Sequence, residues 1–193
     1  MTHVDAFAGH PTLHTMDVSN NHELADVAAL DFVHTLRADR TGVANLQRLG
    51  HLHTLSLSGC DWVTDVSALG NVHTLDLSHC MQLMDVTALR RVHTLSLAGT
   101  NIRRVECLDL VHTLNLAGCH GIDDDGVNAL KFVHSLCLDG CYQLTSVAGL
   151  RFVHTLSLAN CTGLTDVSML GHVHTLDLTG CINVQDFAVE QTT

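Results

Sequence analysis

The sequence predicts a solenoid of nine stacked repeats, each about twenty residues long. Three observations predict this fold class. The tripeptide V/L-H-T/S recurs with its histidines 19 to 22 residues apart, each copy has the same pattern of apolar positions, and 46% of all residues are hydrophobic although only 4% are aromatic. Because a unit of this size cannot bury its own apolar side, neighbouring copies must stack and share one core.

The copies fill the chain from residue 13 onward. Their consensus, V-H-T-L-x-L-x-G-C-x-x-L-T-D-V-x-x-L-x-x, is almost complete at residues 72–91 and 153–172, and repeat positions are numbered from its first valine. Residues 1–12 resemble half a copy, with Val4 and Phe7 where the core expects positions 15 and 18. We therefore predict an N-terminal partial or capping repeat over 1–12 and nine repeats forming one solenoid domain over 13–193.

Each copy contains the pattern of a short strand followed by that of a tight turn. Leucines at positions 4 and 6 alternate with small polar residues, which indicates a strand with one buried face. The apolar positions 12, 15 and 18 recur every three residues, which is the period of a 3₁₀ turn rather than of a long helix. The strand and the turn should therefore lie on opposite sides of a shared core.

The consensus LxxLxLxx(N/C)xxL resembles the signature of leucine-rich repeats over about the whole chain after residue 12. The cysteine at position 9, followed by CHGIDDDGVNAL (119–130), is similar to the cysteine-containing subclass found in F-box proteins. The DVSAL and DVSML tails (65–69 and 166–170) resemble internalins, and the VHTLxLxxC pattern resembles repeat proteins predicted in large DNA viruses of amoebae.

This resemblance implies a fold and a class of function. The fold is α/β, a right-handed leucine-rich-repeat solenoid that curves into an arc, with a parallel β-sheet on the concave face and 3₁₀ or other short turns on the convex face. The function it implies is a non-enzymatic scaffold that binds a protein partner through the concave face or a solenoid end.

Composition and charge disfavour some classes of binding partner. The 9 Lys and Arg against 20 Asp and Glu give a net charge of −11, which disfavours nucleic acid and anionic membranes as partners. Polar residues interrupt every apolar run well before the ~18 residues of a membrane span. The cysteines recur in one slot, unlike the disulfide framework of a small secreted protein. We expect a soluble protein in a reducing cytoplasm, or in the host cytoplasm or virion if it is viral.

No set of residues indicates catalysis. The sequence has no nucleophile, base and orienting group at non-equivalent positions, and no phosphate-binding glycine loop or metalloprotease motif. We therefore expect no enzyme activity, no catalytic residues and no cofactor.

Positions 5 and 7 vary most between copies, as the contact residues of a recognition surface do. The predicted partner-binding residues are Asp17, Arg37, Ser56, Asp76, Ser96, Asn115, Ser157 and Asp177 at position 5, with Ser78 and Asp139 at position 7. Such a face is small, smooth and mildly acidic, and it lacks the Trp and Tyr that favour tight binding. A basic protein partner, or a second copy bound through an uncapped solenoid end, would suit it.

Position 9 forms the first predicted structural ladder. Its cysteines are Cys60, Cys80, Cys119, Cys141, Cys161 and Cys181, and the other copies have Asn21, Thr41 and Thr100 there. All of these side chains are small and can bond to a turning backbone. Redox or metal chemistry is the alternative, which is weaker because buried thiols among leucines lack the positive neighbours that generate thiolates.

Position 2 forms a second predicted ladder. Its histidines are His14, His34, His53, His73, His93, His112, His134, His154 and His174. In the structural interpretation, each ring packs on its neighbour and donates to a backbone carbonyl. In the alternatives, neighbouring rings bind zinc or copper, or the row senses protons. We predict no metal site, and a metal-binding or pH-responsive structural protein is the alternative function.

Three smaller groups of charged residues also have predicted roles. Aspartates at position 14 should accept backbone N–H groups at a turn; they are Asp26, Asp65, Asp85, Asp166 and Asp186. The run Asp123 to Asp125 is expected to be an inserted half-turn with solvated charges. Arg90, Arg91, Arg103 and Arg104 are expected to be a solvated face, with a docking patch for an acidic partner as the alternative.

Overall fold

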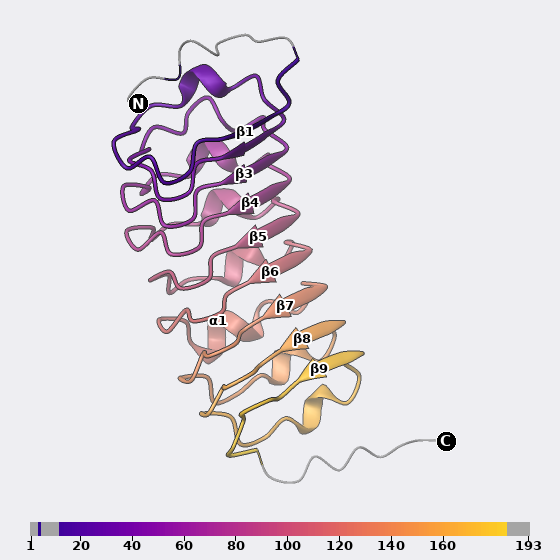
Figure 1. Cartoon of the computed structure of the whole chain (residues 1–193). Helices are drawn as coiled ribbons and strands as arrows, with labels where there is room; N and C mark the ends of the chain where they lie inside the picture. The colour runs from indigo at the N-terminus through magenta and orange to yellow at the C-terminus, as the bar shows by residue number, and fades with distance from the viewer. Residues whose placement is uncertain (1–3, 5–11, 185–193) are drawn as a thin grey trace.

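Nine three-residue strands build one parallel sheet in a computed structural model that describes residue 4 and residues 12–184 (Figure 1). The strands are β1 (Thr15–Asp17), β2 (Thr35–Arg37), β3 (Thr54–Ser56), β4 (Thr74–Asp76), β5 (Thr94–Ser96), β6 (Thr113–Asn115), β7 (Ser135–Cys137), β8 (Thr155–Ser157) and β9 (Thr175–Asp177). They pair in chain order from β1 to β9. The predicted solenoid with a parallel sheet is confirmed.

The strands pair so that the same repeat position lies side by side in every copy. Leu55 of β3 is opposite Leu75 of β4, which is opposite Leu95 of β5. These three leucines are buried, and the residues on either side of them are half-exposed. Parallel strands lie about 4.8 Å apart, so each repeat position becomes a row of side chains along the solenoid.

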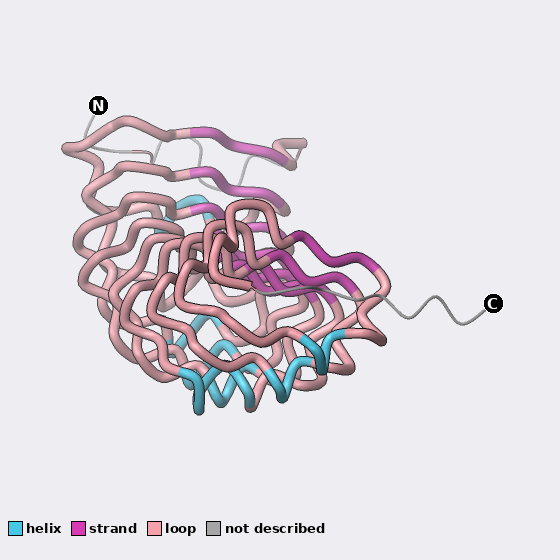
Figure 2. The backbone as a smooth tube through the Cα atoms, turned by 90° about the horizontal axis from the view of Figure 1, so that it is seen from below, coloured by secondary structure: helices cyan, strands magenta, loops and turns pink. Residues whose placement is uncertain are grey.

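Short helical turns lie on the side of the coil opposite the sheet (Figure 2). They are η2 (Ala28–Leu30), η3 (Ser67–Leu69), η4 (Thr87–Leu89), η5 (Glu106–Leu108), η6 (Ala148–Leu150) and η7 (Ser168–Leu170), all 3₁₀ helices, and the α-helix α1 (Asp124–Asn128). Each 3₁₀ turn ends on the buried leucine of position 18, as its period of three predicts. Among the described residues, no helix has the length and hydropathy needed to cross a membrane.

The extra residues of the longest copy form α1. Asp123 precedes this helix, and its carboxylate accepts a hydrogen bond from the Gly126 N–H at 2.9 Å. Asp124 accepts from the backbone N–H of Thr145, at 2.9 Å, and from its hydroxyl. The predicted half-turn is therefore a short helix, and its carboxylates, exposed at Asp123 and half-exposed at Asp124, also accept hydrogen bonds. One caps a helix, and the other links two repeats.

One continuous core of leucine and valine runs through all the coils. The second copy has Ala38 in place of the position-6 leucine, and this alanine is fully buried. Val4, from the predicted partial repeat, also joins the core, whereas Phe7 lies outside the described residues. In the last coil, Leu176 and Leu178 are only partly buried. The pairing of a solenoid end with another copy stays a prediction.

Every copy turns through the left-handed backbone region at position 8. The residues there are Asn20, Arg40, Gly59, His79, Gly99, Gly118, Gly140, Asn160 and Gly180, with φ between 54° and 75°. Glycine adopts this conformation without strain and asparagine tolerates it, whereas other side chains meet a steric penalty. This turn explains the glycine of the consensus.

Replacing Gly140 with alanine should destabilise the protein by about 1 to 2 kcal/mol, because its φ of 70° disfavours a Cβ atom. A Cβ at Gly140 would meet no atom within 4 Å, so backbone strain is the main cost. Urea unfolding followed by circular dichroism measures the change.

Gly171 is the matched control, because a Cβ there would also meet no atom within 4 Å but φ is −59°. Gly171→Ala should be neutral or stabilising by up to about 1 kcal/mol. Equal losses from the two substitutions would contradict the role of the left-handed turn.

Candidate functional site

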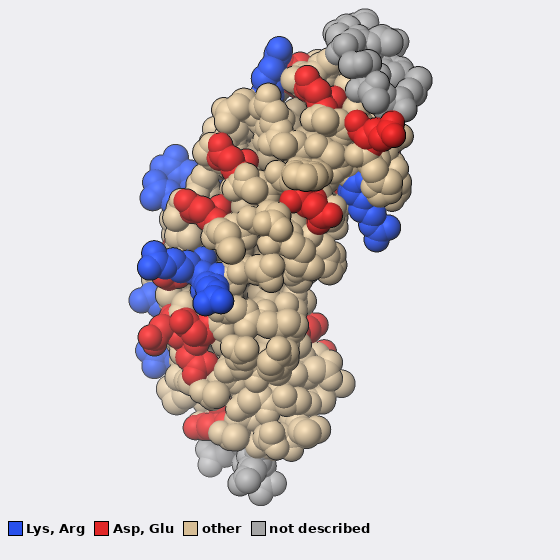
Figure 3. Space-filling model, turned by 90° about the vertical axis from the view of Figure 1, so that its left-hand side faces the viewer, with Lys and Arg blue, Asp and Glu red and all other residues tan. Residues whose placement is uncertain are grey.

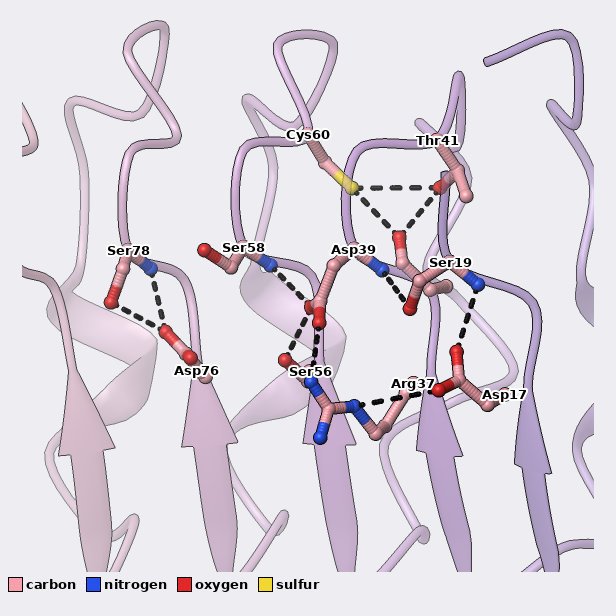
Figure 4. Close-up of polar contacts among 11 residues, drawn as sticks. Asp17, Ser19, Arg37, Asp39, Thr41, Ser56, Ser58, Cys60, Asp76 and Ser78 are labelled. Carbon is pink, nitrogen blue, oxygen red and sulfur yellow. Dashed lines mark hydrogen bonds and ion pairs between the residues drawn. The ribbon is translucent and has the colours of Figure 1, made fainter. Parts of the chain in front are cut away.

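The variable residues of positions 5 and 7 lie where each strand of the sheet ends (Figure 4). Parallel pairing places Asp17 beside Arg37, Ser56 beside Asp76, and Ser157 beside Asp177. The structure therefore brings the predicted partner-binding residues together in two adjacent rows along the concave face: Asp17, Arg37, Ser56, Asp76, Ser96, Asn115, Ser157 and Asp177 in one row, with Ser78 and Asp139 in the other.

Most acidic side chains on this face accept the backbone N–H of position 7. Asp76 accepts from the Ser78 N–H at 2.9 Å, and Asp177 accepts from the Thr179 N–H at 2.8 Å. Asp39 and Asp139 instead bond across repeats, to the N–H groups of Ser58 and Ala159 at 3.0 Å. Within its own copy, the side-chain Oδ1 of Asn115 accepts a hydrogen bond from the Ala117 N–H at 3.0 Å.

Serine hydroxyls hold the same carboxylates in place. The Ser56 hydroxyl donates to Asp39, and the Ser157 hydroxyl donates to Asp139 at 2.5 Å. Ser78 donates to Asp76 at 2.5 Å, and its hydroxyl also lies 2.8 Å from that of Ser96. These bonds fix the positions of the carboxylates before any partner arrives.

The face carries negative charge at neutral pH. Hydrogen bonds from Ser19 and from Thr179 hold the pKa values of Asp17 and Asp177 below the usual range. The one basic residue among the predicted contacts, Arg37, lies 3.0 Å from an oxygen of Asp39 and 3.9 Å from one of Asp17. Its charge is therefore largely matched by neighbours on the same face.

The position-9 thiols connect adjacent repeats. Each donates to the position-6 carbonyl of the preceding copy over 2.9 to 3.3 Å; the donors are Cys60, Cys80, Cys119, Cys141, Cys161 and Cys181. The hydroxyls of Thr41 and Thr100 instead donate to the position-6 carbonyl of their own copy, at 2.7 Å. Burial raises the pKa of Cys80 and of Cys141 to about 12. These two thiols therefore stay protonated and can keep donating.

The position-2 imidazoles form a stack along the exposed start of the strands. From His34 to His154, neighbouring ring centroids are 4.5 to 4.6 Å apart, with planes 9° to 18° from parallel; the stacked rings are His34, His53, His73, His93, His112, His134 and His154. The His174 ring meets His154 edge-on, at 84°.

The hydrogen-bond partner of these rings differs from the predicted backbone carbonyl. In each of the seven stacked histidines, Nδ1 lies 3.2 to 3.5 Å from the hydroxyl of the next residue, Thr or Ser. The histidine carbonyls are already occupied. The His53 carbonyl, for example, accepts the N–H groups of His73 and Thr74 at 3.2 and 2.9 Å. Backbone pairing between repeats thus leaves the hydroxyl as the partner of the ring.

The stacked geometry does not favour metal binding. Metal ligands must aim their lone pairs at one point, whereas nearly parallel rings aim theirs side by side. Within residues 12–184 and residue 4, no group of three or more His, Cys, Asp or Glu side chains is placed to hold a metal ion.

The position-14 aspartates cap the turn that follows them. Asp26, Asp65, Asp85 and Asp166 each accept the N–H two residues later over 2.8 to 2.9 Å. The predicted N–H acceptor role is confirmed for these four, and Asp186 lies outside the described residues.

Comparison with known proteins supports the repeat assignment. A family model described as "Leucine Rich repeat" matches residues 51–70 and 106–131. The structure is similar to internalin C2 from Listeria monocytogenes, with a TM-score of 0.64 and 20% identity over 86% of this chain and 80% of that one. The chain therefore has the fold of a leucine-rich-repeat solenoid.

Two further structures share this fold. Internalin F from Listeria monocytogenes has a TM-score of 0.62 and 17% identity. The match covers 92% of the present chain and 64% of the internalin F chain. The leucine-rich-repeat domain of the type III effector XopL has a TM-score of 0.62 and 19% identity, over 91% and 71% of the two chains. Comparison with curated protein sequences gives no match.

One exposed row of side chains on the solenoid is not predicted by the repeat consensus. It lies directly before position 1, where the consensus shows no preference, and it includes Leu110, Phe132 and Phe152. These side chains are 65%, 66% and 65% exposed. An apolar residue in the same unassigned position of three consecutive copies is the signal that could have revealed it.

We expect only Cys107 and Cys137 to react rapidly with Ellman's reagent in the native protein at pH 8. These two thiols are half-buried, whereas the six position-9 thiols are buried and hydrogen-bonded. Unfolding in urea should release all eight. Rapid reaction of three or more thiols in the native protein would contradict the assigned burial.

Acidification should destabilise the solenoid through the histidine stack. Loss of water contact and repulsion by neighbouring rings lower the pKa values of His53, His112 and His154. The unfolded chain takes up protons more readily, because its histidine pKa values are near 6.5. The contribution of the neutral histidine stack to the free energy of unfolding is therefore fully present above about pH 6.5. It is lost as the pH falls through the lower folded pKa values.

The Tm should therefore fall between pH 7 and pH 5 in differential scanning fluorimetry. A variant with His53→Gln, His112→Gln and His154→Gln should show a shallower decline. A Tm that stays constant across this range in the unaltered protein would disprove the effect.

Proposed function

We propose that this solenoid is a non-enzymatic scaffold that binds a basic protein segment along its concave face. The observation that carries the proposal is a set of five carboxylates in the two adjacent rows of that face, fixed by hydrogen bonds to the backbone or to serine hydroxyls; they are Asp17, Asp39, Asp76, Asp139 and Asp177. Carboxylates held in advance lose little conformational freedom on binding.

The charge of this face favours a basic partner over an acidic one. Arg37, the single cation among the predicted contacts, is already beside Asp17 and Asp39. The remaining aspartates accept uncharged donors, so their negative charge is not neutralised within the face. An arginine or lysine side chain could pair with these carboxylates in a charge-assisted hydrogen bond.

A structural relative supports the choice of a peptide-like ligand. The Arabidopsis receptor kinase HAESA, solved with the peptide hormone IDA and the co-receptor SERK1, is 19% identical with a TM-score of 0.52. The match covers 83% of this chain and 34% of that one. Leucine-rich-repeat proteins commonly bind other proteins, and the proposed function extends this class of interaction to the present chain.

A reducing compartment such as the cytoplasm suits the proposed scaffold. All eight cysteines are unpaired, and the six in position 9 need their protons to donate to the neighbouring repeat. An unpaired, protonated thiol is the form that persists in the cytosol.

A fluorescein-labelled peptide of alternating Arg and Ser tests the concave face by fluorescence anisotropy. Combining Asp76→Asn, Asp139→Asn and Asp177→Asn should weaken its binding at least about tenfold, equivalent to about 1.4 kcal/mol. Added salt should weaken binding to the unaltered protein as well, because the attraction is between exposed charges.

The matched control removes three carboxylates from the convex turns. Asp26, Asp85 and Asp166 cap a backbone N–H in the same way as the concave aspartates. Asp26→Asn, Asp85→Asn and Asp166→Asn together change net charge equally and should leave the affinity within about threefold of the unaltered value. Equal weakening by the two triple variants would disprove a concave-face site.

A further inference from the structure

A row of exposed apolar side chains runs along the side of the solenoid where the strands begin. Leu110, Phe132 and Phe152 belong to three consecutive copies and are each about two-thirds exposed. Each directly precedes a buried valine of position 1. Isolated exposed apolar residues are common, but three at the same repeat position of adjacent copies form a row along the solenoid, which favours an interaction surface.

The repeat geometry holds this stripe rigid. Two residues after each apolar side chain comes a stacked histidine, His112, His134 or His154, with ring centroids 4.6 Å apart. The valines between the two rows are at most 1% exposed and anchor the backbone. The apolar row therefore lies beside the imidazole row, and a ligand would meet it as a preformed surface.

Basic residues surround the stripe. We define the basic-apolar rim as the two residues before position 1 in four consecutive copies: Arg90, Arg91, Asp109, Leu110, Lys131, Phe132, Arg151 and Phe152. Lys131 Nζ lies 5.2 Å from the centre of the Phe132 ring, and the Arg151 guanidinium carbon lies 4.7 Å from that of Phe152. Both distances fit a cation–π contact.

The cations of the rim keep their charge available. In the described part of the chain, the ion pairs of Lys and Arg involve only Arg37 and Arg48. The four rim cations therefore have no carboxylate of the described residues within ion-pair distance. A cation over an aromatic ring still has hydrogen-bond donors for an incoming carboxylate.

The rim contrasts in charge with the rest of the molecule. It contains four of the chain's 9 basic residues but only one of its 20 acidic residues. Figure 3 looks onto this side, where basic side chains gather along one edge with acidic ones between them. The net charge of the chain therefore disfavours an acidic ligand over much of the surface, whereas the rim attracts it.

We propose that the basic-apolar rim is a second docking surface, which binds an acidic protein segment carrying apolar side chains. Apolar side chains of the segment contact Leu110, Phe132 and Phe152, and its carboxylates pair with Lys131, Arg151 and the two arginines of the fourth copy. The surface is separate from the concave face and has the opposite charge preference.

An anionic membrane would also be attracted to exposed rings and cations. A protein segment fits better, because the net charge of −11 opposes approach of the whole chain to an anionic bilayer. A short segment need contact only the rim, whereas a bilayer also faces the acidic residues beside it.

The test uses a fluorescein-labelled peptide in which Glu alternates with an apolar residue, either Phe or Leu. The full chain is titrated into this peptide, and binding is followed by fluorescence anisotropy. We expect saturable binding, and no rim-dependent binding of the peptide in which Lys replaces Glu. Phe132→Ser with Phe152→Ser should weaken binding of the acidic peptide at least about tenfold, since exposed rings supply most of the contact. Lys131→Glu with Arg151→Glu should do the same by reversing the attraction.

Matched controls come from other exposed residues. Tyr142→Ser removes an aromatic ring that is 49% exposed elsewhere. Arg103→Glu with Arg104→Glu reverses two exposed charges, and Arg103 lines a different hollow with Met81 and Met84. Both variants should leave the affinity within about threefold of the unaltered value, since charges outside the docking surface act weakly. The Tm of each variant shows that it is folded.

Three results would overturn the proposal. In the first, the rim variants bind the acidic peptide as tightly as the unaltered protein. In the second, the control variants weaken peptide binding as much as the rim variants do. In the third, the protein binds no peptide but sediments with phosphatidylserine vesicles in a way that depends on the rim. The concave variant with Asp76→Asn, Asp139→Asn and Asp177→Asn should retain the acidic peptide, so failure of one proposal is distinguishable from failure of the other.

Discussion

The whole structure depends on the burial of each repeat's leucines against its neighbours. A coil of about twenty residues has no interior of its own, so the core exists only as a column shared by successive copies. In-register parallel pairing, with Leu75 between Leu55 and Leu95, keeps that column continuous. The same pairing places every other repeat position beside its equivalent, which turns single side chains into rows.

These rows meet their hydrogen-bonding needs in different ways, and the difference decides which can take part in binding. The position-9 thiols are buried and donate to the preceding copy, so they contribute cohesion between repeats. The concave aspartates also bond to the protein, but they stay at the surface with their charge intact. A single residue such as Asp139 can therefore stabilise two repeats and still attract a ligand. The histidine stack is exposed, and it destabilises the folded chain when its rings gain protons.

The molecule separates two kinds of surface along one solenoid. Carboxylates follow the strands on the concave face, and cations with aromatic rings precede the strands on the basic-apolar rim. Because each set of charged side chains is spread over several copies, an elongated segment lying across those copies is the proposed ligand of each surface. The two proposed surfaces have opposite charge preferences, so the proposed ligands would not compete for one surface.

The sequence by itself determined the repeat, the buried strand face, the 3₁₀ turns and the role of aspartates such as Asp65, because these follow from local periodicity and turn chemistry. Only the tertiary structure decided which groups become partners across copies. Thr54, rather than a carbonyl, lies beside the His53 ring because backbone pairing already occupies the histidine carbonyls. The thiol of Cys80 bonds to Leu57 of the preceding copy, and Phe132 joins Phe152 in an exposed row. Such contacts depend on how the copies stack, and a pattern within one copy does not contain that information.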